Sequence, residues 1–174
     1  MMTRLFNPAI RIFFLLCVLS ASGIANQAAA EEPAAKSAEV PIKVVYHADF
    51  ADPRRFSAML TNIHNMVSTY QAELTDYDVR IVFVSHGIRF VTPDKLAGTP
   101  FAEDAELKQR RANLLGRLAT LRDTQGVKLE LCEITRAAVH LPKEKIIPGV
   151  ALVPSGVVRI AELQHQGFAY LKVQ

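Results

Sequence analysis

The stretch Val79-Arg80-Ile81-Val82-Phe83-Val84, followed by Ser85-His86-Gly87, decides the fold. Its first six residues are mostly β-branched or aromatic, which is typical of a strand buried inside a sheet. The Ser-His-Gly segment then ends the strand. Four further runs of this kind occur along the chain, at residues 42–46, 127–131, 150–153 and 168–171.

Segments with helical periodicity separate these five predicted strands. Asp52-Pro53 is typical of an N-cap followed by proline in the first turn, and apolar residues then recur at helical spacing from Phe56 to Leu74. Further helices are expected from Leu107 to the stop at Gly126 and over 135–140 and 157–166, and a loop is expected over 92–104. This alternation predicts an α/β fold with a five-stranded parallel sheet that helices cover on both faces.

Length and composition place the chain among ordinary globular proteins. Its 174 residues are 50% hydrophobic and 21% charged, which suits one folded domain and is too apolar for a disordered chain. We expect this domain over residues 42–174. A polar, Ala-rich and flexible lead-in at residues 31–41 is expected to precede it.

The first thirty residues have the pattern of a secretory signal peptide. Arg4 and Arg11 precede a short apolar run at residues 12–19, and small residues follow up to Ala30. The run is too short to span a membrane, which takes about 20 residues. We therefore expect cleavage after Ala30, or alternatively after Ala25, and a periplasmic mature protein without a membrane anchor.

Removal of this segment changes the charge and the cysteine count. Of the remaining residues, 18 are basic and 17 are acidic, so the net charge falls to +1. Such a balanced chain has no general attraction to nucleic acid or to an anionic membrane, and neither is expected as a partner. A single cysteine, Cys132, remains and cannot form an internal disulfide.

Residues with useful chemistry gather where the predicted strands end. Ligands of open parallel sheets bind outside the carboxyl ends of the strands, which share one edge of the sheet. In this chain, that edge carries a thiol, two imidazoles and several hydroxyls: His47, Asp49, Ser85, His86, Gly87, Cys132, Thr135, Ser155 and Gly156.

Cys132 is the leading candidate among these residues because it follows a strand and precedes a helix. The free N–H groups and the positive dipole at a helix start favour thiolate over thiol. Burial at the end of an apolar strand would instead make Cys132 a small packing residue with a raised pKa. Both interpretations remain open from the residues alone.

The other polar residues at this edge also have structural interpretations. His86 fits a histidine that hydrogen-bonds to a loop carbonyl, and His47 is distinguished by its position alone. Ser155 fits a helix cap, because Val153-Pro154-Ser155-Gly156 lacks the first glycine of a nucleophile elbow.

Several kinds of chemistry have no motif in the sequence. It has no Cys-x-x-Cys for dithiol exchange, no His and Cys cluster with metal-ligand spacing, and no glycine-rich phosphate loop after the first strand. We therefore expect neither a metal nor a cofactor.

Three segments carry a resemblance to a known family. They are Lys43-Val44-Val45-Tyr46-His47, Val82-Phe83-Val84-Ser85-His86-Gly87, and the more specific Gly126-Val127-Lys128-Leu129-Glu130-Leu131-Cys132-Glu133-Ile134-Thr135, which continues in matching pieces to Tyr170. With these segments the chain resembles the DsrE/DsrF-like family, and in particular its exported single-domain members.

The resemblance implies a three-layer α/β/α fold and assembly into trimers or hexamers. It also implies a sulfur relay, because cytoplasmic members carry sulfur as a persulfide on a cysteine after the third strand. Cys132 falls at that position. The sequence departs from the exported members at Ile134, where they usually have asparagine, so a polar group near the thiol is lost.

Two hypotheses of function follow. In the first, Cys132 accepts a sulfane sulfur from a donor protein and passes it to an acceptor, His86 is the proton partner, and Thr135 helps to stabilise the charge. In the second, Cys132 only packs, and the chain is a non-catalytic oligomeric module that binds a small ligand or a protein.

Overall fold

The structure, a computed structural model, describes residues 40–174. The predicted signal peptide at residues 1–30 and most of the lead-in lie outside the described residues. Within residues 40–174, no helix has both the length and the apolar content of a membrane span.

Five strands form a single parallel sheet with the order β4-β3-β2-β1-β5. This confirms the predicted α/β fold with a five-stranded parallel sheet. The strands are β1 (Ile42–Ala48), β2 (Tyr77–Phe83), β3 (Lys128–Cys132), β4 (Val150–Val153) and β5 (Ala169–Leu171).

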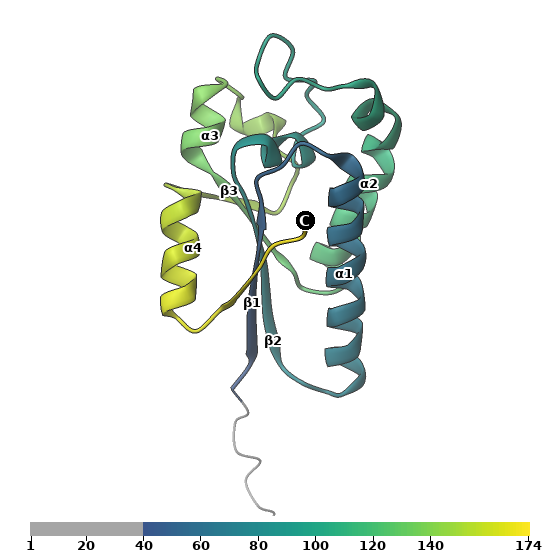
Figure 1. Cartoon of the computed structure of the whole chain (residues 1–174), viewed down its shortest axis with the longest axis vertical. Coiled ribbons are helices and arrows are strands. Elements are labelled where there is room, and N and C mark those ends of the chain that lie inside the picture. Colours follow the sequence, from purple (N-terminus) through teal and green to yellow (C-terminus); the bar gives the residue numbers. More distant parts are fainter. Residues whose placement is uncertain (1–39) are drawn as a thin grey trace, which may run out of the picture. The chain divides into compact units, whose positions relative to one another are not determined.

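Helices cover both faces of this sheet and make three layers (Figure 1). On one face lie α1 (Pro53–Ala72) and α2 (Ala105–Asp123), and on the other lies α4 (Gly156–His165), which contacts β1, β2 and β3. This is the layering that the family resemblance implied. Shorter helices occupy the connections: η1 (Ser85–Phe90), α3 (Glu133–Ala138) and η2 (Lys143–Lys145).

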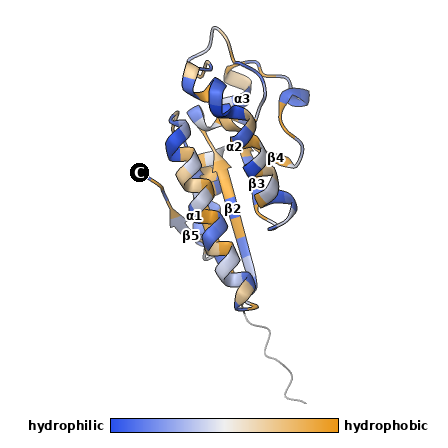
Figure 2. Ribbon diagram, turned by 90° about the vertical axis from the view of Figure 1, so that its right-hand side faces the viewer, coloured by the Kyte–Doolittle hydropathy of each residue, from blue (hydrophilic) through white to orange (hydrophobic). Residues whose placement is uncertain are grey.

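The larger core lies between the sheet and the pair α1 and α2. Alternate residues of β2, namely Val79, Ile81 and Phe83, point to this side and are fully buried. Phe56 of α1 stacks on Phe90 with 4.1 Å between ring centroids and meets Phe83 edge-on. Figure 2 shows the strongly hydrophobic carboxyl end of β2. The apolar run that predicted this strand therefore forms the centre of the core.

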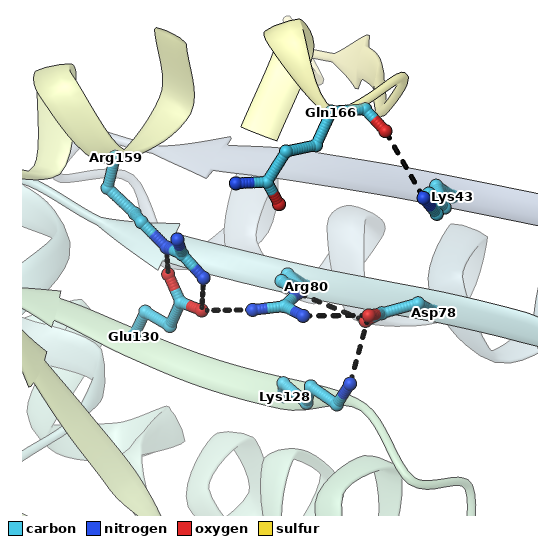
Figure 3. Close-up of polar contacts among 7 residues, drawn as sticks. All are labelled: Lys43, Asp78, Arg80, Lys128, Glu130, Arg159 and Gln166. Carbon is cyan, nitrogen blue, oxygen red and sulfur yellow. Dashed lines mark hydrogen bonds and ion pairs between the residues drawn. The ribbon is translucent and has the colours of Figure 1, made fainter. Parts of the chain in front are cut away.

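The face under α4 combines a small core with a charged network. In the network, Glu130 of β3 accepts hydrogen bonds from Arg80 at 2.8 Å and from Arg159 of α4 at 2.7 Å (Figure 3). Asp78 in turn accepts hydrogen bonds from Arg80 and Lys128. The network thus attaches α4 to β3 two residues before Cys132. The apolar part consists of Val45, Val82, Ile160, Leu163 and Phe168.

Two predicted element boundaries are wrong in an instructive way. The helix expected to continue to Leu74 ends at Ala72, and Leu74 itself has a φ of 54° and is 82% exposed. The short helix expected from Thr135 begins at Glu133, because β3 extends to Cys132 and passes directly into α3. Cys132 is therefore the N-cap residue of α3.

Candidate functional site

Cys132 lies where the starts of two helices meet. It is the last residue of β3 and the N-cap of α3, its thiol is free, and the residue is 4% exposed. Its side chain is on the face covered by α4, since a Cβ built on Gly156 would come within 3.1 Å of the Cys132 Cβ. The thiol therefore neighbours the first turns of both α3 and α4.

Gly156 allows α4 to begin this close to the sheet. A Cβ at this position would lie 2.5 Å from Cγ2 of Val84, closer than side-chain atoms pack. The preceding Ser155 caps the helix as expected, because its hydroxyl accepts a hydrogen bond from the Val158 N–H at 3.4 Å. The N–H group of Gly156 lies near the thiol of Cys132 and lowers its pKa.

The surroundings of Cys132 favour its charged form. Burial raises the pKa of the thiol because the thiolate loses water. Hydrogen-bond donors outweigh burial and bring the pKa below its ordinary value: the backbone N–H groups of Gly156, Thr135 and Ile134, and the hydroxyl of Thr135. The thiolate is the nucleophilic form, so this environment suits a reactive cysteine.

Thr135 connects the thiol to the end of β2. The residue is buried, and its Oγ1 accepts a hydrogen bond from the Ser85 N–H at 3.0 Å. Since the oxygen accepts from Ser85, the hydroxyl proton is free for the sulfur. Ser85 has a φ of 54°, which is uncommon for a residue with a side chain and turns the chain from β2 into η1.

His86 contacts other groups than the thiol. Its Nδ1 lies 3.4 Å from the Ser85 hydroxyl, and its ring meets Phe101 edge to face with 5.0 Å between centroids. Phe101 belongs to the predicted loop at 92–104, so this loop packs on His86. The structure therefore brings Cys132 and Thr135 together. His86 instead lies beside Ser85, whose backbone N–H donates to Thr135.

Charged side chains also fix the same loop. Arg111 of α2 pairs with Glu103 at 2.8 Å, with the two side chains only 12% and 10% exposed. Arg89 of η1 pairs with Asp104, which also caps α2. The loop is thus tied to η1 and to α2 at its C-terminal end.

The remaining candidates at this edge form a group of their own. His47 contacts Tyr170 of β5, and Asp49 pairs with Lys172. Among residues 40–174, no cluster of three or more His, Cys, Asp or Glu side chains is arranged to hold a metal ion.

The main contribution that sequence reasoning missed is the backbone of Gly156 and the start of α4. The residue was expected at this edge of the sheet, but its contact with Cys132 joins positions 24 residues apart in the chain. The sequence feature that could have indicated this contact is the Ser155-Gly156 pair. A capping serine is followed there by a residue without a side chain, which lets the start of a helix approach the sheet closely.

Comparisons with known proteins agree with this architecture. A family model for the DsrE/DsrF-like family matches residues 44–173. An uncharacterized protein of Aquifex aeolicus is 26% identical over 132 residues, which make up 75% of this chain and 56% of that protein. The chain therefore spans little more than half the length of this relative.

Two solved structures are similar to this chain. A protein of unknown function from Methanobacterium thermoautotrophicum has a TM-score of 0.56 and 26% identity, with 75% of this chain and 98% of that chain covered. The ychN protein of E. coli has a TM-score of 0.46 and 19% identity at the same coverage.

Proposed function

Because the chain belongs to the DsrE/DsrF-like family, we propose that it carries sulfur as a persulfide on Cys132 and passes it to a partner thiol. The observation that supports this most is the environment of Cys132, where N–H groups from the starts of α3 and α4 favour the thiolate. Sulfur donor and acceptor proteins are the proposed partners.

The transfer is a thiolate exchange in two steps. The Cys132 thiolate attacks the terminal sulfur of a donor persulfide, R–S–SH, and the new S–S bond forms as the donor's S–S bond breaks and the donor leaves as its thiolate. An acceptor thiolate then attacks the terminal sulfur on Cys132, which leaves as a thiolate again. Neither step needs an external oxidant or reductant. Thr135 and the N–H group of Gly156 stabilise Cys132 before the first step and after the second.

His86 is proposed as the proton partner of this site. Its Nδ1 atom lies beside the Ser85 hydroxyl, whereas the hydrogen bond to Thr135 comes from the Ser85 backbone N–H, so the support for this role is nearness to the site and not a continuous chain of hydrogen bonds. If His86 acts as an imidazolium, His86→Ala raises the pKa of Cys132. An unchanged pKa would instead assign His86 to packing against Phe101.

Mass spectrometry tests the carrier function. The purified protein is incubated with thiosulfate or polysulfide, and the intact mass is measured before and after addition of a reductant. We expect a reducible gain of one sulfur atom that is missing in Cys132→Ser. The same gain in Cys132→Ser, or no gain in the wild type, would contradict the proposal.

Alkylation kinetics test whether the thiolate is available. Rates with iodoacetamide between pH 5 and 10 are expected to give a pKa below the free-thiol value of about 8.5. A pKa at or above that value, or labelling only in denaturant, would make Cys132 a packing residue.

The 4% exposure of Cys132 favours a second candidate function. In this alternative the chain is a non-catalytic oligomeric module that binds a small ligand or a protein at the same edge of the sheet. The two experiments above distinguish the functions, because the module predicts a slowly reacting thiol and no transferable sulfur.

We propose that the protein is exported and acts in the periplasm. The pattern of Arg4, Arg11 and the apolar run at 12–19 supports it. The mature protein is expected to begin near Glu31 and to fractionate with periplasmic contents. N-terminal sequencing that finds Met1 or Met2 on a membrane-bound species would contradict this.

A further inference from the structure

The carboxyl end of β1 carries a second group of polar side chains, separate from Cys132. The Nδ1 atom of His47 lies 3.0 Å from the Tyr170 hydroxyl on β5, and Nε2 lies 3.9 Å from Oδ2 of Asp49. The Asp49 carboxylate also accepts a hydrogen bond from Lys172 at 2.8 Å. Asp49, Tyr170 and Lys172 are the titratable groups that face His47.

A cavity of about 300 Å³ lies beside His47 and Tyr170. This volume is at the lower end of the range for small-molecule sites. The other lining residues come from α4 and are Val157, Ile160, Ala161 and Gln164. Among these described lining residues none is an acid, a lysine or an arginine, so the cavity has no ion pair to offer a charged ligand.

The hydrogen bond between His47 and Tyr170 has a preferred direction. Nε2 is buried without a hydrogen-bond partner among the described residues, and the Asp49 carboxylate 3.9 Å away acts on it by its charge, which favours the neutral tautomer with the proton on Nε2. Nδ1 then accepts the Tyr170 hydroxyl proton, and the lone pairs of the Tyr170 oxygen remain free to accept a hydrogen bond. Tyr170 is 37% exposed, so a ligand can reach this oxygen.

We propose that this cavity binds a small uncharged molecule with an apolar body and a single N–H or O–H donor, which the Tyr170 oxygen accepts. The apolar side chains of α4 hold the body of the ligand. The lining residues that the structure describes offer a charged molecule no acid, lysine or arginine to pair with, so the site favours an uncharged ligand. The amide of Gln164 is the second polar group on the cavity wall.

Acid reverses the hydrogen-bonding character of the site. Burial lowers the pKa of His47 below its ordinary value of 6.5; nearby Asp49 opposes this and Lys172 adds to it. His47 is therefore neutral at pH 7. Once protonated, Nδ1–H donates to the Tyr170 oxygen, whose own proton then turns toward the cavity. In the acidic state His47 takes one lone pair of that oxygen and the Tyr170 proton faces a ligand donor, so a ligand with only a donor binds more weakly than in the neutral state.

Two probes of equal shape test the site. Indole carries one N–H donor, and benzofuran replaces that N–H by oxygen. The protein is produced from its full-length gene in ¹⁵N-labelled form, and amide shifts of Val157, Ile160 and Gln164 are followed at pH 7.5. We expect saturable binding of indole, about two- to tenfold tighter than benzofuran. This preference should disappear as His47 is protonated.

Variants separate the hydrogen bond from the cavity. Tyr170→Phe is expected to remove the preference for indole, and Ala161→Trp is expected to abolish binding of both probes by filling the cavity. Glu162→Trp, the matched control on the next residue of α4, should bind indole like the wild type. Equal binding of the two probes, absence of saturable shifts, or unchanged binding in Ala161→Trp would each overturn the proposal.

Discussion

At the scale of single residues, the hydroxyl of Thr135 serves two partners at once. It accepts the hydrogen bond of the Ser85 N–H and stabilises the thiolate of Cys132. Both partners are at the ends of neighbouring strands, so one buried side chain couples the thiol to the turn that follows β2.

Thr135→Val keeps the shape of the side chain and removes this hydroxyl. The thiolate loses a donor and the Ser85 N–H loses its acceptor. We expect a higher pKa for Cys132 in alkylation kinetics and a free energy of unfolding lower by about 1–3 kcal/mol in urea titrations. Thr135→Ser is the control and should retain most of both properties. A Val variant with an unchanged Cys132 pKa would contradict the assigned role.

At the scale of elements, the position of α4 depends on the charged network beneath it. Arg159, one turn after Gly156, donates two hydrogen bonds to Glu130, which precedes Cys132 by two residues on the same strand (Figure 3). This contact fixes the first turn of α4 against β3. It therefore helps to hold the Gly156 N–H at the thiol.

Arg159→Met tests this coupling between α4 and the thiol. Loss of the guanidinium frees the first turn of α4, so the Gly156 N–H is held less firmly near the thiol and the pKa of Cys132 rises. Because the Arg159 side chain is 22% exposed, we expect a stability loss of only about 1–2 kcal/mol.

Lys43→Met is the matched control for this prediction. Lys43 donates to the carbonyl of Gln166 at the other end of α4. Its loss should leave the pKa of Cys132 unchanged in alkylation kinetics. An equal shift in both variants would indicate a general charge effect rather than positioning by Arg159.

At the scale of the whole molecule, the network makes stability depend on pH. Burial raises the pKa of Glu130, but hydrogen bonds from Arg159 and Arg80 outweigh it, so the pKa lies below its ordinary value. The same holds for Asp78. Burial raises its pKa, but hydrogen bonds from Arg80 and Lys128 outweigh burial, so its pKa also lies below the ordinary value. The unfolded chain therefore takes up these protons at higher pH than the folded chain does.

The stabilisation from these carboxylates is complete above about pH 4.3, near the unfolded value, and is lost as pH falls through the lower folded values. We expect urea midpoints to fall steeply below that pH. Glu130→Gln should flatten this dependence, and Glu73→Gln, at an exposed helix end, should not. Identical acid profiles for the wild type and Glu130→Gln would disprove the role of the network.

Assembly is a second property at this scale. The family resemblance implies a trimer or a hexamer, although a domain of this size can bury a core by itself. The exposed apolar side chains of Ile134 in α3 and Val158 in α4 lie on the surface where we expect copies of the chain to meet. Light scattering at micromolar concentration is expected to give a trimeric or hexameric mass. A monomer mass would refute this prediction.

The sequence by itself determined the elements and the class of the fold. The apolar run at 79–84 predicted a buried strand, Asp52 predicted a helix start, and Ser155 predicted a cap, because each feature depends on neighbours a few residues away. The place of Cys132 at the junction of a strand and a helix was likewise visible in the local pattern.

The tertiary structure alone decided which groups surround the thiol. Gly156 reaches Cys132 because α4 crosses the sheet, and Thr135 reaches Ser85 because β2 and β3 are neighbours. The contact of His86 with Phe101 and that of His47 with Tyr170 could not be predicted from the sequence either. Local patterns encode periodicity and capping, whereas the pKa of a buried thiol depends on burial and on donors from distant segments, which meet only in the folded chain.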